Sequence, residues 1–149
     1  ILYSGTPFQS ISDQSKGLMF EEIAGMVYSS FVAQATKSVE KSYDYLNVTT
    51  RIEVKSGSLR VHRERIRFHF QCIKENKFDE LLLVFHFPEY LEFWLWDGST
   101  GLTTCGERTS VRGKNILFYC SFDTEKRRYI LKRKPGEFLC ALSLVNQCD

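Results

Sequence analysis

The chain has 149 residues, of which 43% are hydrophobic, 14% aromatic and 26% charged. These proportions fit one globular domain with a sizeable core, and they exclude a chain that is mainly disordered. The formal net charge of +2 is too small to indicate a polyanionic partner by itself, so the distribution of charge along the chain has to decide that question. No apolar run approaches the roughly 20 residues that a membrane-spanning helix needs, and we expect no membrane segment.

Cysteine usage predicts an intracellular, cytoplasmic protein. The five cysteines are odd in number and form no repeated Cys-x-x-Cys pair of the kind that binds zinc. We therefore expect reduced thiols, several of them buried. The first residues, from Ile1 onward, lack an initiator Met and the charged start of a signal peptide, which favours a trimmed piece of a longer protein.

In chain order, the first predicted element is a long amphipathic helix over residues 12–36. Its apolar residues recur at intervals of three and four, and Ser12 or Asp13 suits the N-cap position. Two short strands are predicted next, at 43–48 and 51–55, because these segments are rich in Tyr, Val, Ile and Thr.

A buried strand is predicted over residues 80–87, where an apolar run shows no alternation. Such a strand implies helices on both faces of its sheet. Residues 66–73 alternate like a strand, but a parallel partner for the strand at 51–55 requires a crossover that is normally helical. We therefore favour a short helix around 70–75 within this crossover.

The second half of the chain is predicted to be mostly strands. An antiparallel strand at 91–96 follows a proline turn, and further strands are expected at 115–121 and 128–132. Residues 137–145 form either a closing helix or a strand. The predicted fold class is α/β, with a central mixed sheet flanked by helices in a single domain over 1–149.

Acidic side chains and a lysine occur at an informative spacing. Glu53 and Lys55 are two residues apart on a predicted strand, so they project from the same face. Asp44 lies nine residues before Glu53, a distance that lets two neighbouring strands place both carboxylates together. Converging carboxylates repel each other unless a divalent cation neutralises them, and such oxygen ligands suit Mg²⁺ or Mn²⁺. The spacing therefore predicts a metal site.

These residues form an ordered set that resembles the PD-(D/E)XK nuclease superfamily, the restriction-endonuclease-like fold. The stretches 67–73 and 78–84 also resemble the aromatic-Gln-Ile segment and buried strand that follow the catalytic lysine in type II restriction enzymes. The resemblance covers residues 17–97, about half of the chain, and Tyr43 stands where the superfamily name has proline. Its pieces are Gly17-Leu18-Met19-Phe20-Glu21 on the helix, Asp44, and Ile52-Glu53-Val54-Lys55-Ser56.

The resemblance implies a Mg²⁺-dependent endonuclease that hydrolyses DNA phosphodiester bonds, with Mn²⁺ as a substitute metal. Asp44 and Glu53 would bind the metal, with the Val54 carbonyl as a third ligand. Lys55 would orient or deprotonate the attacking water, or stabilise charge on the phosphate. Glu21 would complete the outer metal shell, and Glu22 is the alternative from the same helix.

Basic residues gather at 60–69 and 126–134 in spite of the small net charge. We expect the first cluster to contact phosphates, because it directly follows the Glu-x-Lys strand. The loop at 97–114 is long and rich in small polar residues, so it either reads bases in a groove or is a mobile connection. Gln71 resembles a glutamine near the active site of the superfamily, and a polar turn residue is the alternative. The predicted nucleic-acid contacts are Arg60, Arg63, Arg65, Arg67, Gln71, Arg108 and Arg112.

Two other functions remain open. One is a non-catalytic nucleic-acid-binding module that keeps the nuclease fold. The other is an RNA-cleaving viral endonuclease of the same superfamily, although such enzymes commonly place a histidine on an early helix and the first histidine here is His62. We expect the catalytic core at 13–97, with 98–149 unassigned. Cutting both strands of a symmetric site requires two active sites, so we expect a homodimer or a larger assembly on DNA.

Overall fold

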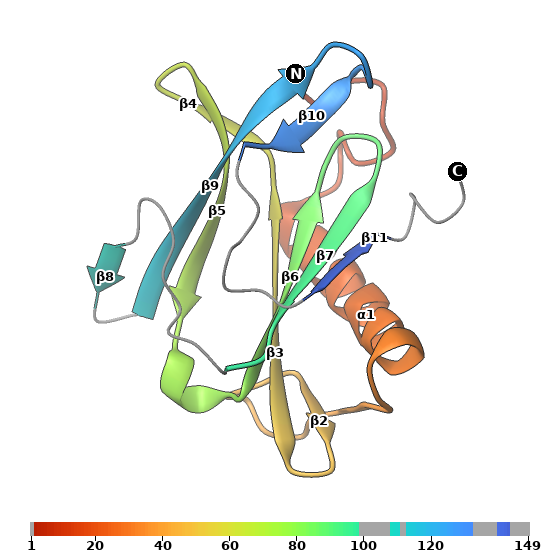
Figure 1. The fold of residues 1–149 in the computed structure, drawn as a ribbon, viewed down its shortest axis with the longest axis vertical. Coiled ribbons are helices and arrows are strands. Elements are labelled where there is room, and N and C mark those ends of the chain that lie inside the picture. The colour runs from red at the N-terminus through yellow and green to blue at the C-terminus, as the bar shows by residue number, and fades with distance from the viewer. Residues whose placement is uncertain (1, 99–107, 111–112, 133–139, 144–149) are drawn as a thin grey trace.

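Two β-sheets and one long helix make up the part of the chain that the structure, a computed structural model, describes: residues 2–98, 108–110, 113–132 and 140–143 (Figure 1). The elements are α1 (Asp13–Phe31), β1 (Thr36–Lys37), β2 (Tyr45–Asn47), β3 (Thr50–Ser58), β4 (Arg60–His62), β5 (Arg65–Ile73), the 3-10 turn η1 (Glu75–Lys77), β6 (Glu80–His86), β7 (Leu91–Trp96), β8 (Arg108–Ser110), β9 (Gly113–Asp123), β10 (Arg128–Leu131) and β11 (Cys140–Ser143). The first sheet has the order β1-β2-β3-β6-β7-β11, and the second has the order β10-β9-β5-β4 with β8 paired to β9.

Helix α1 begins where the sequence predicts and ends before it. Ser12 is the N-cap, and its hydroxyl accepts a hydrogen bond from Ser15 N–H at 3.2 Å. The helix ends at Phe31, five residues before the predicted end at 36. The chain turns back there because Ser29 Oγ accepts a hydrogen bond from Ala35 N–H at 3.1 Å. No helix in the described residues is long and apolar enough to span a membrane.

The first sheet is mixed, which confirms the predicted α/β class at this level. β2 and β3 form an antiparallel hairpin, and β3 then runs parallel to β6 from Ile52↔Glu80 to Ser58↔His86. β6 pairs on its other side with antiparallel β7. The predicted burial of β6 on both faces is confirmed, because the side chains from Leu81 to His86 are all buried.

The predicted short helix at 70–75 is wrong. Residues 65–73 form strand β5, and the single 3-10 turn η1 follows it at 75–77. The alternation that the sequence shows decides the structure: Phe68 and Phe70 point into the core while their neighbours point out. A hairpin turn with positive φ at Arg63 (49°) and Glu64 (66°) joins β4 to β5, so the crossover from β3 to β6 passes through strands.

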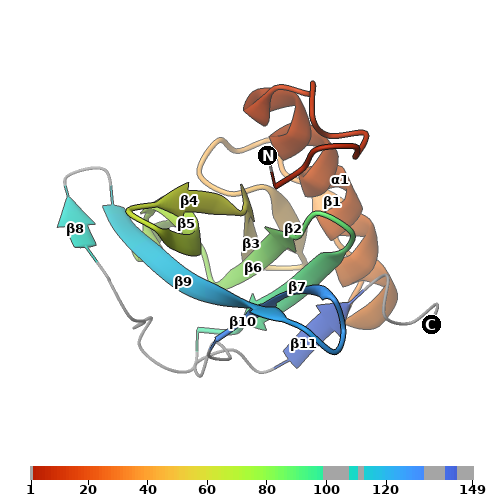
Figure 2. The same ribbon diagram turned by 90° about the horizontal axis from the view of Figure 1, so that it is seen from above.

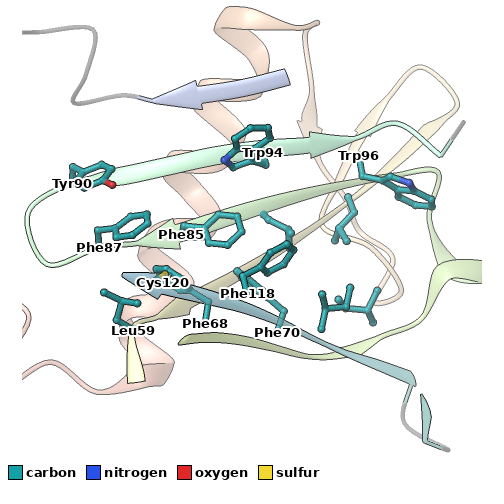
Figure 3. Packing of buried hydrophobic residues seen from close by; sticks show 14 of the residues in the cluster. Leu59, Phe68, Phe70, Phe85, Phe87, Tyr90, Trp94, Trp96, Phe118 and Cys120 are labelled. Atoms are coloured by element: carbon teal, nitrogen blue, oxygen red, sulfur yellow. The ribbon is translucent and has the colours of Figure 1, made fainter. Parts of the chain in front are cut away.

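The prediction of helices on both faces of the sheet is also wrong for the described residues. Helix α1 covers one face, and the second sheet covers the other (Figure 2). The layer between the sheets is aromatic, with Phe68, Phe70 and Phe118 packed edge-on around Phe85 (Figure 3). The alternating apolar residues of β5 and β9 therefore supply the cover that a second layer of helix would otherwise give.

The strands predicted after β7 are present, whereas the short strands β1 and β8 were not predicted. β9 and β10 correspond to the strands predicted at 115–121 and 128–132. The open choice at 137–145 contains a strand, β11, which pairs with β7 from Cys140↔Leu95 to Ser143↔Glu92. Cys72 and Cys120 are free thiols, and Cys120 is buried.

Candidate active site

The candidate site lies at the start of strand β2, where its pairing with β3 ends. Backbone pairing between the two strands ends at Tyr45↔Ile52, and Asp44 N–H still donates to Ile52 O at 2.9 Å. The Asp44 side chain makes the next hydrogen bond along β3, in which Asp44 Oδ2 accepts from Val54 N–H at 2.8 Å. A backbone N–H at a strand edge needs a partner, and here a carboxylate supplies it. Asp44 is therefore fixed against β3 by main-chain and side-chain bonds.

Three half-buried carboxyl groups from separate elements meet at this point. Glu21 comes from α1, Asp44 from the residue before β2, and Glu53 from β3. Asp44 is hydrogen-bonded to both glutamates. The fold thus brings together the three acids that the sequence singled out.

The three carboxyl groups shift the pKa values of one another. The hydrogen bond to Asp44, followed by burial and the Asp44 charge, raises the pKa of Glu21 to about 7. Burial, followed by the hydrogen bond to Asp44, raises the pKa of Glu53 to about 9. Burial also disfavours the ionised form of Asp44, but hydrogen bonds from Glu53, Glu21 and Val54 N–H outweigh it and lower the pKa of Asp44. At neutral pH an ionised Asp44 therefore lies between a protonated Glu53 and a partly protonated Glu21.

Two lysines offset the negative charge of the cluster. Lys55 is two residues after Glu53 on β3, and its positive charge favours the ionised forms of both Asp44 and Glu53. Lys37 Nζ, on β1, lies 3.9 Å from Glu21 Oε2. The lysine of the Glu-x-Lys spacing therefore acts electrostatically on the two carboxylates that were predicted to bind metal.

Of the two neighbouring glutamates on α1, Glu21 reaches the cluster. Glu22 is exposed to solvent, whereas Glu21 is half-buried and bonded to Asp44. Successive residues on an α-helix point about 100° apart, so the two side chains cannot share one contact.

The contact that sets α1 against the hairpin is one that sequence reasoning missed. The Tyr45 ring lies against Gly25, so closely that a Cβ atom on Gly25 would overlap it. Tyr45 Oη also donates a hydrogen bond to Glu21 O at 3.0 Å. Because Tyr45 directly follows Asp44, this contact places Asp44 beside Glu21. The available signal was a glycine four residues after Glu21 inside a helical pattern, where glycine usually indicates a packing constraint.

The donors at this site suit a hard divalent cation. The described residues contain no group of three or more His, Cys, Asp or Glu side chains already spaced to hold a metal ion. Here the carboxyl groups bond to one another through protons instead. Removal of those protons would leave three like charges, and carboxylate and carbonyl oxygens are the ligands that Mg²⁺ and Mn²⁺ prefer. A cation could bind among these donors only with release of those protons.

A groove of about 420 Å³ is lined by the residues of β3 that directly follow Lys55, although no residue of the carboxyl cluster lines it. Residues of α1 line the groove on one side, and residues of β4 and β5 line it on the other. The groove is thus continuous with the strand that carries Glu53 and Lys55. Its lining residues are Asp13, Lys16, Gly17, Phe20, Ser56, Gly57, Ser58, Arg60, Val61, His62, Arg67, His69 and Gln71.

The predicted nucleic-acid contacts divide between the groove and its surroundings. Arg60, Arg67 and Gln71 line the groove, and Gln71 lies on a strand, not in a turn. Arg63 is exposed in the turn between β4 and β5, and the Arg65 guanidinium stacks 5.3 Å from the centre of the Tyr119 ring. The structure therefore places three of the seven predicted contacts in the groove.

The predicted base-reading loop falls mostly outside the described residues. Arg112 lies outside them, as do residues 99–107 of the loop at 97–114. Arg108 lies on the short strand β8, which pairs with β9 through Arg108↔Asn115. The expectation that Arg108 or Arg112 reads bases stays a prediction.

Known proteins give no further indication of the chemistry. Comparisons of the chain with models of protein families, with curated proteins and with solved structures found no match. The function of the site is therefore inferred from its own residues.

Proposed function

We propose that this protein is a metal-dependent endonuclease that hydrolyses DNA phosphodiester bonds, with a core of the restriction-endonuclease-like kind. One observation carries the proposal: Glu21, Asp44 and Glu53 meet beside Lys55, and the next residues of the same strand line a groove with basic side chains. Clustered carboxylates for a divalent cation, a lysine and a path for a polyanion are the parts that phosphodiester hydrolysis requires.

The order of the elements supports the same proposal. The helix with Glu21 precedes a hairpin with Asp44 and Glu53, and β3 of that hairpin lies parallel to the buried strand β6. This is the order that the resemblance to PD-(D/E)XK nucleases leads one to expect. The crossover through β4 and β5 departs from that expectation, and it supplies the second wall of the groove.

Each residue of the cluster has a separate role in this proposal. Asp44, Glu53 and the Val54 carbonyl would hold Mg²⁺, or Mn²⁺ in its place, with Glu21 in the outer shell. When bound, the metal would neutralise charge on the phosphate and favour ionisation of water. Lys55 orients or deprotonates the attacking water, or offsets charge that develops on the phosphate. The basic side chains of the groove hold the strand so that the scissile bond stays at the cluster.

The test is incubation of supercoiled plasmid DNA with the protein in Mg²⁺, with EDTA as the control, followed by mapping of the new ends. We expect cleavage in Mg²⁺ alone. Discrete fragments would identify a sequence-specific enzyme, which needs two such centres to cut both strands and hence a homodimer or a larger assembly. Random nicking would identify a nonspecific one. Salt-dependent DNA binding without cleavage in Mg²⁺ or Mn²⁺ would contradict the proposal and indicate a binding module.

A further inference from the structure

The far end of the groove holds an acid between two cations. Asp13, at the start of α1, lies 3.3 Å from Lys16 Nζ through Oδ1 and 2.7 Å from an Arg60 guanidinium nitrogen through Oδ2. Arg60 is on β4, so its contact with Asp13 joins the two walls of the groove. One carboxylate therefore serves two positive charges that come from opposite sides.

Lys16 is an unusual residue for this position. Its exposed fraction is 9%, and its ammonium group lies 5.6 Å from the centre of the Tyr3 ring. Lysine is seldom buried unless it is paired, because removal of its charge from water is costly. Its carboxylate partner is the Asp13 side chain, which is 71% exposed. A buried cation in a groove, paired with an acid that faces solvent, can exchange that partner for an anion from solution.

The charge of the groove favours an incoming anion. Its lining includes three permanent cations, Lys16, Arg60 and Arg67, and one acid, Asp13. Three positive charges and one negative charge leave a balance of +2 before any contribution from His62 or His69. An anion that replaces Asp13 would meet this charge within a recess, where charges are screened less than on an open surface.

The position of this pair relative to the carboxylate cluster identifies the anion. Ser58 of β3, which lines the groove, is three residues after Lys55, a distance of about 10 Å along the strand. A nucleic-acid strand with its scissile phosphodiester at the cluster could extend along the groove and present a further phosphate at Lys16 and Arg60. The ammonium group of lysine and the guanidinium group of arginine are the usual partners of such phosphates.

We propose that Lys16 and Arg60 form a phosphate subsite for the substrate strand, and that Asp13 occupies this subsite until the strand displaces it. This inference rests on the proposed nuclease function. Asp13 then limits affinity for the strand, because every binding event has to break its two ion pairs. Arg60 and Lys16 supply affinity, and neither takes part in the chemistry at Glu53 and Lys55.

The test is equilibrium binding of a fluorescein-labelled single-stranded DNA oligonucleotide in EDTA, measured by anisotropy at several salt concentrations. Asp13→Asn is expected to bind roughly two- to fivefold more tightly than wild type, the range for release of an exposed ion pair. Arg60→Gln is expected to bind roughly fivefold more weakly and to reduce the salt slope by about one. Because one variant gains affinity and the other loses it, a general folding defect cannot produce both results.

Matched controls carry the same charge changes away from the groove. Glu40→Gln removes an exposed acid and Lys126→Gln removes an exposed cation. The proposal is overturned if Asp13→Asn binds no more tightly than Glu40→Gln, or if Arg60→Gln binds no more weakly than Lys126→Gln. It is also overturned if inorganic phosphate at matched ionic strength fully displaces the oligonucleotide, which would identify a site for the free anion. The binding assay contains no divalent metal, so its result does not depend on cleavage. The nuclease proposal fails separately, if the wild-type protein does not cleave DNA in Mg²⁺.

Discussion

Asp44→Asn and Lys55→Ala are each expected to reduce Mg²⁺-dependent DNA cleavage by roughly 10²–10⁴-fold, while the thermal unfolding transition stays cooperative. Asp44 is the acid at the centre of the cluster, hydrogen-bonded to Glu21, Glu53 and Val54 N–H. Asparagine can keep the hydrogen bond from Val54 N–H but loses the charge that a cation requires. Lys55→Ala removes the ammonium group beside the two carboxylates without disturbing the buried side of β3. Single-turnover cleavage of plasmid DNA measures both effects.

The helix offers a matched control for the third acid. Glu21→Gln is expected to reduce cleavage, whereas Glu22→Gln, at the exposed neighbouring position, is expected to leave the cleavage rate within about twofold of wild type. If both glutamine variants lose the same cleavage activity, the negative charge of the helix, and not the contact of Glu21 with Asp44, determines the cleavage rate. Full activity in Asp44→Asn would contradict the assignment of the site.

Gly25→Ala is expected to destabilise the protein by about 2 kcal/mol and to reduce cleavage as well. The added Cβ would overlap the Tyr45 ring, and overpacking of this kind costs about 1–3 kcal/mol. The higher helix propensity of alanine recovers only part of this loss. Because Tyr45 adjoins Asp44, displacement of its ring also moves the carboxylate away from Glu21. Urea denaturation measures the free energy of unfolding, and plasmid cleavage measures the effect on the site.

Gly17 on the same helix is the control for that substitution. A Cβ on Gly17 would meet nothing within 4 Å, so Gly17→Ala is expected to stabilise the protein by about 0.5–1 kcal/mol. A second variant, Tyr45→Leu, shortens the side chain that the new Cβ would meet. If Gly25→Ala is as destabilising in the Tyr45→Leu background as in wild type, the Tyr45 contact is not the cause.

Sequence patterns predict the elements that local rules determine. The helix at α1 follows from its apolar periodicity and its serine cap, and β6 follows from an unbroken apolar run bounded by polar residues. A helical crossover, usual for a parallel pair of strands, leads one to expect a short helix at 70–75, but the alternation at 66–73 is the better guide, because β5 extends to Ile73. The second sheet forms because β5 pairs with β9, a contact between distant segments that no local pattern records.

In the candidate site, too, local patterns predict some residues, whereas contacts between distant segments position others. Glu53 and Lys55 are predictable because they lie two residues apart on one strand, and Asp44 because it directly precedes the adjacent strand β2. The Tyr45 contact with Gly25 and the Asp13 contact with Arg60 join residues 20 and 47 positions apart, and neither pair has a recognisable motif. These contacts depend on how α1 lies against the strands, which is determined by packing of the whole core.

The proposed nuclease activity requires one divalent cation to bind among Glu21, Asp44 and Glu53 in exchange for protons. Calorimetric titration of Mn²⁺ into metal-free protein near pH 7, in two buffers of different ionisation enthalpy, measures both the metal and the protons. We expect one bound Mn²⁺ with release of about one proton or more, because Glu53, whose pKa is raised to about 9, must ionise to bind the cation, and the cation also favours ionisation of Glu21 in the outer shell, whose pKa is raised to about 7. Asp44→Asn is expected to abolish this binding. Equal Mn²⁺ binding by Asp44→Asn, or wild-type binding without proton release, would contradict a metal site at this cluster.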